Sequence, residues 1–179
     1  MTGPKTDRLK KLASFIEALE RRGVYKFKIS VFYNRLRLQK YVFIAKYFGV
    51  VDFGYPYNMY LHGPYSPALA DDYYELANAG KDWKMYVDDK YLEEIEKKKE
   101  FEEFVKFVEN RDGKWLEVAA TILGFWESVM KYVRLGVIKK EELEEKVKKL
   151  TKNRKPFATS RMIDEVFEDL KLYKLLNTT

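Results

Sequence analysis

The chain has 179 residues, of which 46% are hydrophobic and 35% are charged, a balance that excludes a disordered protein and is typical of a folded globular one. It contains no cysteine, which excludes disulfides, thiolate nucleophiles and zinc–thiolate sites. The longest apolar stretch, Val118 to Trp126, is about half of the roughly 20 residues that a membrane-spanning helix needs. Because no charged leader with an apolar stretch is recognised either, we expect a cytoplasmic protein without membrane association.

Aromatic residues are unusually frequent, with 12 Phe, 14 Tyr and 3 Trp. Large rings must therefore carry much of the core packing, and some tyrosines must reach the surface. Abundant Lys and Glu, together with absent Cys and few Met, also fit a protein from a thermophile, since ion-pair networks become less costly to desolvate at high temperature.

The positive charge is concentrated near the N-terminus. The net charge is +6, but residues 1–49 hold 12 Lys or Arg against 3 Asp or Glu, whereas residues 50–80 hold no Lys or Arg and 4 Asp or Glu. A local positive surface attracts nucleic acid, an acidic protein or anionic lipid, and charge alone does not choose among these partners.

The first elements in chain order are two helices. The first is expected over 7–22, with Thr6 as its N-cap and Gly23 at its end. Residues 25–29 alternate between apolar side chains and lysines, which predicts a short strand or an extended lead-in. The second helix, over 34–48, has apolar residues around almost the whole cylinder, so it should lie inside the fold. Its narrow polar stripe consists of Arg35, Gln39 and Lys46.

A strand, a tight turn and a capped helix are expected next. Residues 57–61 have strand-like content, 62–65 form a turn cluster, and Ser66-Pro67 has the residues preferred at a helix start. That helix should end at Gly80, and residues 83–87 are suited to a return strand. Together with the two preceding helices, this order is similar to a winged-helix arrangement.

The second half is predicted to be helical. A charged helix capped by Asp88 or Asp89 should reach Asn110, with a break at the lysine run 97–99. Residues 114–135 are the candidate for a central buried helix. A surface helix over 139–150 and a last helix, capped by Thr159 or Ser160 and ending near Leu176, complete the chain. We therefore expect a mainly α fold with a few short β-strands, in which a winged-helix-like part (1–88) packs on a helical part (89–179) as one compact unit.

Several segments resemble a known family. Residues 35–40 on an apolar helix, followed by 60–66 before a helix, are similar to the pattern of the YwgA-like uncharacterised proteins, to which the Panacea (SocA-like antitoxin) domain is related. Residues 115–122 and 155–157 also look like this pattern, and the similarity extends roughly from Leu9 to Leu176. The motif residues that carry it are Gln39, Lys40, Gly63, Pro64, Tyr65 and Ser66.

The resemblance implies little about chemistry. YwgA-like proteins have no established activity, whereas Panacea domains are similar to winged-helix folds and often act as antitoxins beside varied toxins. No agreed catalytic residues come with the family. Leu61 and His62 stand where its members vary, so nothing is carried over to them.

The motif residues also have structural interpretations. Gln39 and Lys40 are candidates for a ligand or phosphate contact, but a Gln on a buried helix more often hydrogen-bonds a neighbouring turn. The segment 63–66 can shape a binding edge, yet Gly permits the turn, Pro stiffens it, and Ser66 satisfies free amides of the next helix. His62 is the only histidine, and one His without another His or a Cys is a poor metal site. We favour the structural interpretation for each.

Catalytic motifs are not recognised, so we expect neither an enzyme nor a bound cofactor or metal. There is no phosphate-binding Gly-rich loop, histidine pair or nucleophile elbow. The Glu-x-Lys spacings at 96–98 and 144–146 lie in Glu/Lys-rich helical tracts, where solvated ion pairs explain them better. Asp71, Asp72 and Glu75 are a weak magnesium candidate, because acidic residues are expected in a first helical turn. An unrecognised hydrolase or nuclease site is the weakest alternative.

Two functional hypotheses remain. The first is a nucleic-acid-associated, winged-helix-like regulator that binds DNA or RNA by phosphate neutralisation. The acidic residues of the helix after Ser66 argue against that helix entering a groove. The second hypothesis is a protein-interaction module, such as the antitoxin-like partner of a toxin, which the abundant tyrosines favour. The oligomeric state is not predicted. Candidate binding residues under either hypothesis are Arg35, Gln39, Lys46, Lys152, Arg154, Lys155 and Arg161.

Overall fold

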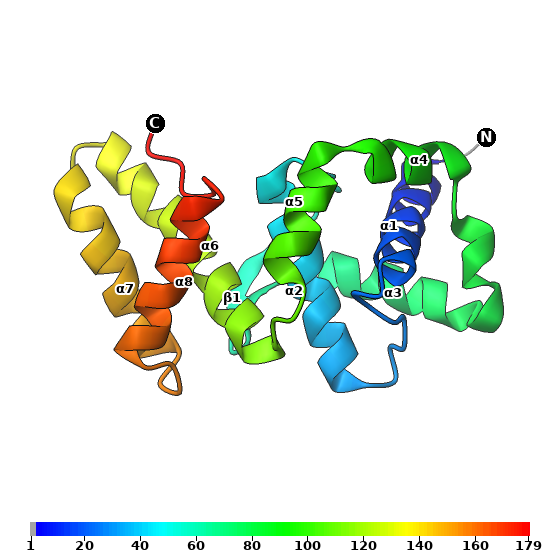
Figure 1. Ribbon diagram of the computed structural model, residues 1–179, viewed down its shortest axis with the longest axis horizontal. Helices are drawn as coiled ribbons and strands as arrows, with labels where there is room; N and C mark the ends of the chain where they lie inside the picture. Colours follow the sequence, from blue (N-terminus) through cyan, green and yellow to red (C-terminus); the bar gives the residue numbers. More distant parts are fainter. Residues whose placement is uncertain (1–2) are drawn as a thin grey trace. The chain divides into compact units, whose positions relative to one another are not determined.

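The computed structural model describes residues 3–179 and is mainly α-helical, with one short two-stranded sheet (Figure 1). The chain divides into two compact units, one of residues 3–58 and 65–110 and the other of residues 59–64 and 111–179. The sequence predicts a division at residue 88, whereas the structure keeps residues 89–108 in the first unit. The reason is packing: α4 (Asp89–Lys97) packs on α1 (Pro4–Arg21), and α5 (Lys99–Val108) packs on α2 (Phe32–Phe48).

The elements follow the predicted order closely. The helices of the first unit are α1 (Pro4–Arg21), α2 (Phe32–Phe48), α3 (Pro67–Asn78), the 3-10 helix η1 (Gly80–Tyr86), α4 (Asp89–Lys97) and α5 (Lys99–Val108). The strands β1 (Asn58–Tyr60) and β2 (Gly63–Tyr65) form a hairpin. The helices of the second unit are α6 (Gly113–Arg134), the 3-10 helix η2 (Lys140–Glu142), α7 (Leu143–Arg154) and α8 (Ser160–Leu172).

The predicted N-caps of three helices are confirmed, whereas α7 and α8 differ from the bounds predicted for them, 139–150 and an end near Leu176. The Ser66 hydroxyl caps α3 by accepting a hydrogen bond from the Leu69 amide at 3.2 Å, Asp88 caps α4, and Thr159 caps α8. The break within the charged helix falls at Lys98, between α4 and α5. The N-cap predicted at Thr6 is wrong: α1 begins earlier, after Gly3, because a proline at its first position is pre-organised for a helix.

Two predicted strands are absent from the described residues. Residues 25–28 have no regular secondary structure and residues 29–30 form a turn, and Asn34 of α2 donates hydrogen bonds to the Lys26 and Lys28 carbonyls at 3.4 Å. The predicted return strand over 83–87 is instead largely part of η1, where Trp83 is buried with its ring 5.1 Å from Phe27. The hairpin β1–β2 is the paired sheet of the described residues, and the winged-helix-like part stays a prediction.

The core of the first unit is built from rings. Phe104 of α5 lies fully buried, with its ring centroid 5.9 Å from Phe15 of α1 and 6.2 Å and 5.8 Å from Tyr41 and Phe48 of α2. Every residue of α2 from Leu38 to Ala45 is buried, which confirms the predicted interior helix. Only the first turn of α2 reaches the surface to a large extent.

The second unit is organised around α6. This helix is the predicted central one: most of its residues from Leu116 to Leu123 have no exposed surface, and it packs on both α7 and α8. Trp126 contacts Phe167 of α8 at 6.2 Å between ring centroids, and its indole N–H donates a hydrogen bond of 2.7 Å to the Asn177 carbonyl. The C-terminal segment is thereby fixed to α6.

The tyrosines of the first-unit core predict loss of stability at high pH. Burial raises the pKa of Tyr25, Tyr55, Tyr57 and Tyr73 well above the ordinary value of about 10. Unfolding therefore releases protons above pH ~10, and each such tyrosine removes about 1.4 kcal/mol of stability per pH unit there. The lowered pKa of Lys155 acts in the opposite direction, but through one proton only.

The measurement is thermal unfolding followed by circular dichroism from neutral pH to about pH 12, with tyrosinate absorbance recorded in parallel. We expect the melting temperature to fall steeply above pH ~10, and a subset of tyrosines to ionise only as the chain unfolds. A single ionisation step near pH ~10 for all tyrosines in a chain that remains folded would contradict this.

Candidate functional site

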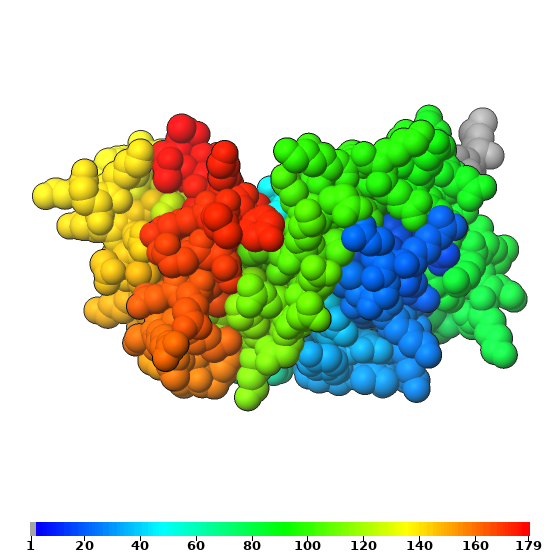
Figure 2. All heavy atoms as spheres, in the orientation of Figure 1, coloured from blue at the N-terminus to red at the C-terminus, as the bar shows by residue number. Residues whose placement is uncertain are grey.

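The loop before α2 and the first turn of α2 form a positively charged, aromatic surface of the first unit. We call Lys26, Lys28, Phe32, Tyr33 and Arg35 the basic–aromatic surface. Both lysines and both rings are exposed, and Arg35 is half-exposed. Figure 2 shows that α1 (blue) and the segment that follows it (lighter blue) both reach the face in view.

Hydrogen bonds hold the loop against the helix start. The Arg35 guanidinium donates to the Ile29 carbonyl at 2.7 Å, and the Tyr25 hydroxyl donates to the Asn34 carbonyl at 2.9 Å. Tyr25 and Ile29 are buried under this surface, whereas the intervening Lys26 and Lys28 point outward. The surface is therefore fixed by the packing below it.

Each exposed ring lies beside a guanidinium. Arg35 lies over the Phe32 ring at 5.6 Å, and Arg37 lies over the Tyr33 ring at 5.6 Å. Arg37 is itself held by a hydrogen bond of 2.8 Å to the Val24 carbonyl. The Phe32 and Tyr33 rings remain 55% and 44% exposed. Each cation–π pair at a surface contributes about 0.5–1 kcal/mol. These contacts orient the two exposed rings.

The electrostatic environment of this surface is positive. Residues 21–51 hold 8 Lys or Arg and no Asp or Glu. Among residues 3–179, neither Lys26 nor Lys28 forms an ion pair, whereas Arg21 and Arg22 are paired with Glu96 and Glu102. The first turn of α2 also has no acidic residue and no side-chain cap, so the positive end of its dipole adds to the field.

One carboxylate lies close by. A Glu20 oxygen accepts a hydrogen bond of 3.2 Å from the Phe27 amide, which places one negative charge at the edge of the lysine segment. The surface nevertheless keeps an excess of positive charge, because Lys26, Lys28 and Arg35 together outnumber it.

Only Arg35 of the predicted residues in the first unit belongs to this surface. Gln39 is buried, and its amide both donates to the Ser66 carbonyl at 2.9 Å and accepts from the Ser66 amide at 3.0 Å. Lys40 is 1% exposed, and Lys46 is half-buried against the rings of Phe43 and Tyr47. These two hydrogen bonds are of the kind that the structural interpretation of Gln39 predicts. They clamp the chain before α3.

The rest of the turn motif is mostly covered. Gly63 and Pro64 are buried and Tyr65 is half-buried. The backbone φ of Gly63 is +87°, in the left-handed region that favours glycine, so the residue permits the turn between β1 and β2. These three positions offer little surface to a partner.

In the second unit, Lys155 is a buried residue that holds the hairpin. Its ammonium donates to Glu117 Oε1 and to the Leu61 carbonyl, both at 2.5 Å, and only 1% of the residue is exposed. Burial lowers the pKa of Lys155, although Glu117 opposes this. His62 Nδ1 lies 3.4 Å from the other Glu117 oxygen, and Arg154 donates to the Met59 carbonyl at 3.2 Å. Both predicted cations therefore support residues 59–62.

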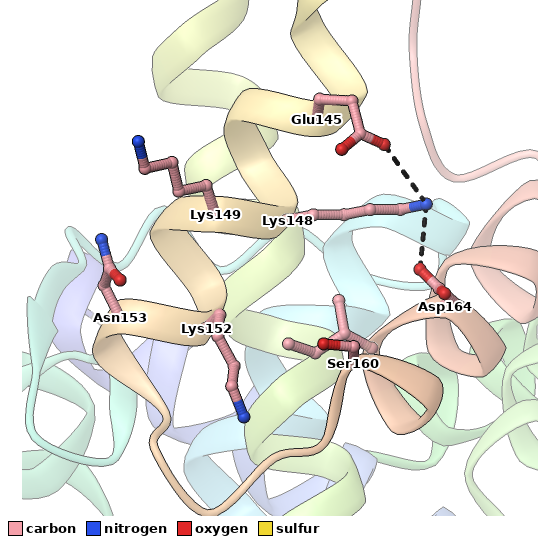
Figure 3. A pocket seen from close by; sticks show the side chains of 8 residues that line it. Glu145, Lys148, Lys149, Lys152, Asn153, Ser160 and Asp164 are labelled. Carbon is pink, nitrogen blue, oxygen red and sulfur yellow. Dashed lines mark ion pairs between the residues drawn. The ribbon is translucent and has the colours of Figure 1, made fainter.

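A groove of about 390 Å³ between α7 and α8 contains Lys152 (Figure 3). Lys148 crosses it, with its Nζ 3.0 Å from Asp164 and 3.9 Å from Glu145. Lys149 points away from Ser160 and Asp164, and Lys152 donates to the Ala158 carbonyl. Internal partners therefore take up the cations at the centre of this groove.

The predicted Arg161 lies in acidic surroundings. It pairs with Glu165 at 2.9 Å and lines a depression together with Asp164, Glu168 and Asp169. These carboxylates outnumber the two arginines of the depression, Arg161 and Arg111, so the local field repels phosphate.

The acidic residues of α3 are partly neutralised. Asp72 is fully buried, accepts from Arg8 at 2.6 Å and 3.2 Å, and accepts from the Tyr55 hydroxyl at 2.7 Å. Glu75 pairs with Lys5 at 2.6 Å, while Asp71 is exposed. Among residues 3–179, no group of three or more His, Asp or Glu is placed to hold a metal ion.

The comparisons with known proteins give no relative. No family model, no curated protein and no solved structure matches the chain. Over residues 3–179, none of the helices combines the length and the apolar character needed to cross a membrane.

Sequence reasoning missed Lys26, Lys28, Phe32 and Tyr33. Two signals were present: the absence of any acidic residue from 21–51, and the lysines at alternate positions of a segment whose apolar residues turn inward. The exposure of Phe32 and Tyr33 has no such signal, since a Phe-Tyr pair at a helix start is equally compatible with burial.

Removing one partner of the Lys155–Glu117 pair is expected to destabilise the second unit. Lys155→Met leaves the Glu117 carboxylate buried without its counter-charge, which costs about 3–5 kcal/mol. The double variant Glu117→Leu with Lys155→Met should recover most of this loss, because it leaves no buried charge. Urea unfolding measures both, with the exposed Lys149→Met as the matched control. Equal loss in the single and double variants would contradict the buried-pair account.

The Gln39 clamp makes a second stability prediction. Gln39→Leu leaves the amide of the buried Ser66 without its partner, which costs about 1–3 kcal/mol, whereas the Ser66 carbonyl keeps the hydrogen bond that it accepts from the Ala70 amide. Ser66→Ala removes only the cap of α3 and should cost about 1 kcal/mol. Chemical denaturation ranks the two variants, and a Gln39→Leu protein as stable as wild type would contradict the clamp.

Proposed function

We propose that this protein is a nucleic-acid-associated regulator that binds phosphate groups through the basic–aromatic surface of its first unit. The observation that carries the proposal is the pair of exposed lysines, Lys26 and Lys28, beside the exposed first turn of α2, in a stretch without any acidic residue. Cations without internal partners are the ones available to neutralise phosphates, and phosphate neutralisation supplies most of non-specific nucleic-acid affinity.

The distribution of ion pairs supports the choice of this surface. Of the seven residues predicted from sequence, Gln39 and Lys155 are buried, and Lys152 and Arg154 donate to backbone carbonyls. Arg161 lies among carboxylates. Arg35 is the predicted residue that borders exposed lysines, so the first unit rather than the basic loop 152–161 is the better candidate.

An alternative is a protein-interaction module, such as an antitoxin-like partner of another protein. It is supported by exposed apolar side chains at the end of α6, where Tyr132, Leu135 and Val137 are 53%, 75% and 70% exposed. Such residues are favoured at protein interfaces. The resemblance to the YwgA-like and Panacea proteins is compatible with this alternative and stays a prediction.

Charge reversal of the two lysines is the direct test. For Lys26→Glu with Lys28→Glu, we expect affinity for oligonucleotides at low salt to fall about tenfold or more. The slope of log affinity against log salt should fall by about 1.4 to 1.8, since two phosphate contacts are lost. Fluorescence anisotropy of labelled DNA and RNA over a salt series measures both quantities.

The matched control is Lys90→Glu with Lys99→Glu, which changes the net charge equally. Both residues are exposed and lie in the first turns of α4 and α5, where a Glu is compatible with the helix dipole. Equal loss of affinity in the two double variants would contradict the assignment to this surface. Millimolar binding at low salt by the wild-type protein would remove the nucleic-acid proposal and favour the interaction module.

A further inference from the structure

Whether the basic–aromatic surface fits a duplex or a single strand depends on whether a helix beside it is able to enter a duplex groove. A recognition helix must present several consecutive exposed turns to base edges. In α2 the residues from Leu38 to Ala45 are buried, so only its first turn is exposed. A duplex groove therefore cannot receive the length of α2.

The helix α3 is equally unsuited to a groove. Its exposed side chains include Asp71 and Tyr74 and no Lys or Arg, so α3 itself supplies no positive charge. Phosphates on either side of a groove repel such a face. Neither α2 nor α3 is thus able to read a duplex in the usual way.

The surface instead has the parts of a stacking platform. Phe32 and Tyr33 are exposed by 55% and 44%, and the guanidinium groups of Arg35 and Arg37 hold the two rings. Bases inside a duplex already have both faces stacked, whereas unpaired bases are free to stack on an aromatic ring. Asn34, the residue after Tyr33, donates hydrogen bonds of 3.4 Å to the Lys26 and Lys28 carbonyls, which places both lysines beside the first turn of α2.

From these contacts we infer that the basic–aromatic surface binds single-stranded nucleic acid, with bases stacked on Phe32 and Tyr33 and phosphates on Lys26 and Lys28. The inference rests on the proposed function and specifies its ligand. Neighbouring positions of a helix point about 100° apart, so the two rings take two different bases, and the strand bends around the first turn of α2. Stacking and phosphate contacts are common to DNA and RNA, so the shared chemistry defines the ligand.

The test compares oligo(dU), oligo(U) and a DNA duplex of equal length on the full chain, for the wild type and for the double variant Phe32→Leu with Tyr33→Leu. Leucine keeps the helix but removes the aromatic faces. Loss of one stacked base lowers affinity about fivefold or more, so the double variant should bind single strands about 25-fold more weakly. Its affinity for the duplex should change by less than about twofold, because the lysines remain.

A matched control removes one exposed Phe and one exposed Tyr from the second unit. Phe157→Leu with Tyr132→Leu replaces rings that are 43% and 53% exposed and should leave single-strand affinity unchanged. Circular dichroism confirms that all variants are folded. Tighter binding of oligo(dU) or of oligo(U), which differ in the sugar alone, identifies the preferred sugar, with the same loss in Phe32→Leu, Tyr33→Leu required for either.

The outcomes separate this inference from the proposed function. If the ring variant binds single strands as wild type does, while Lys26→Glu with Lys28→Glu still lowers affinity about tenfold or more, the stacking inference is overturned and the proposed function stands. Preferential binding of the duplex has the same consequence. If wild type binds none of the three probes at low salt, both the inference and the proposed function are overturned.

Discussion

The near-complete burial of α2 is the constraint on which the arrangement of the first unit depends. A helix with apolar residues on all sides must be covered by neighbours, and α5 together with the residues below the 25–30 loop covers it. Tyr25 and Ile29 point into this interior, which leaves Lys26 and Lys28 no direction except outward. The exposed first turn of α2 then places Phe32, Tyr33 and Arg35 beside them. One packing requirement thus accounts for both the core and the candidate binding surface.

In the second unit, positive charge has a different use. Lys155 and Arg154 donate to backbone carbonyls of residues 59–61, and Lys152 donates to the Ala158 carbonyl. A buried lysine needs a counter-charge and hydrogen-bond acceptors, because the cost of removing its ammonium from water is large. Glu117 and the Leu61 carbonyl supply them. The lysine-rich segment near residue 155 therefore stabilises the hairpin, and its cations are less available to a binding surface.

The fold was more predictable from sequence than the site. Helix boundaries follow from capping residues and apolar periodicity, which are local signals, and Ser66, Asp88 and Thr159 each cap the helix that they were expected to cap. The return strand predicted at 83–87 did not form, and at 25–29, where alternation predicted a strand or an extended lead-in, no strand formed. Alternation reports burial on one side and does not supply a strand partner.

Whether a basic residue belongs to the candidate site depends on what its side-chain charge contacts in the fold. Sequence shows that Lys152, Lys155 and Arg161 are basic, but the fold determines whether a basic side chain meets a carbonyl, a carboxylate or solvent. Arg35 was identified because it lies on the polar stripe of α2. The lysines beside it were not, because they precede the helix and the periodicity of α2 contains no information about them.

The most direct test of the central claim is photo-crosslinking of a short single-stranded oligonucleotide, followed by tryptic digestion and mass spectrometry. Cleavage after Lys28 and Arg35 releases residues 29–35, which contain both exposed rings, and cleavage after Arg154 and Arg161 releases residues 155–161, which contain Phe157. The account predicts adducts on Phe32 and Tyr33 in the first peptide. Adducts confined to the second peptide, with none in residues 29–35, would contradict it.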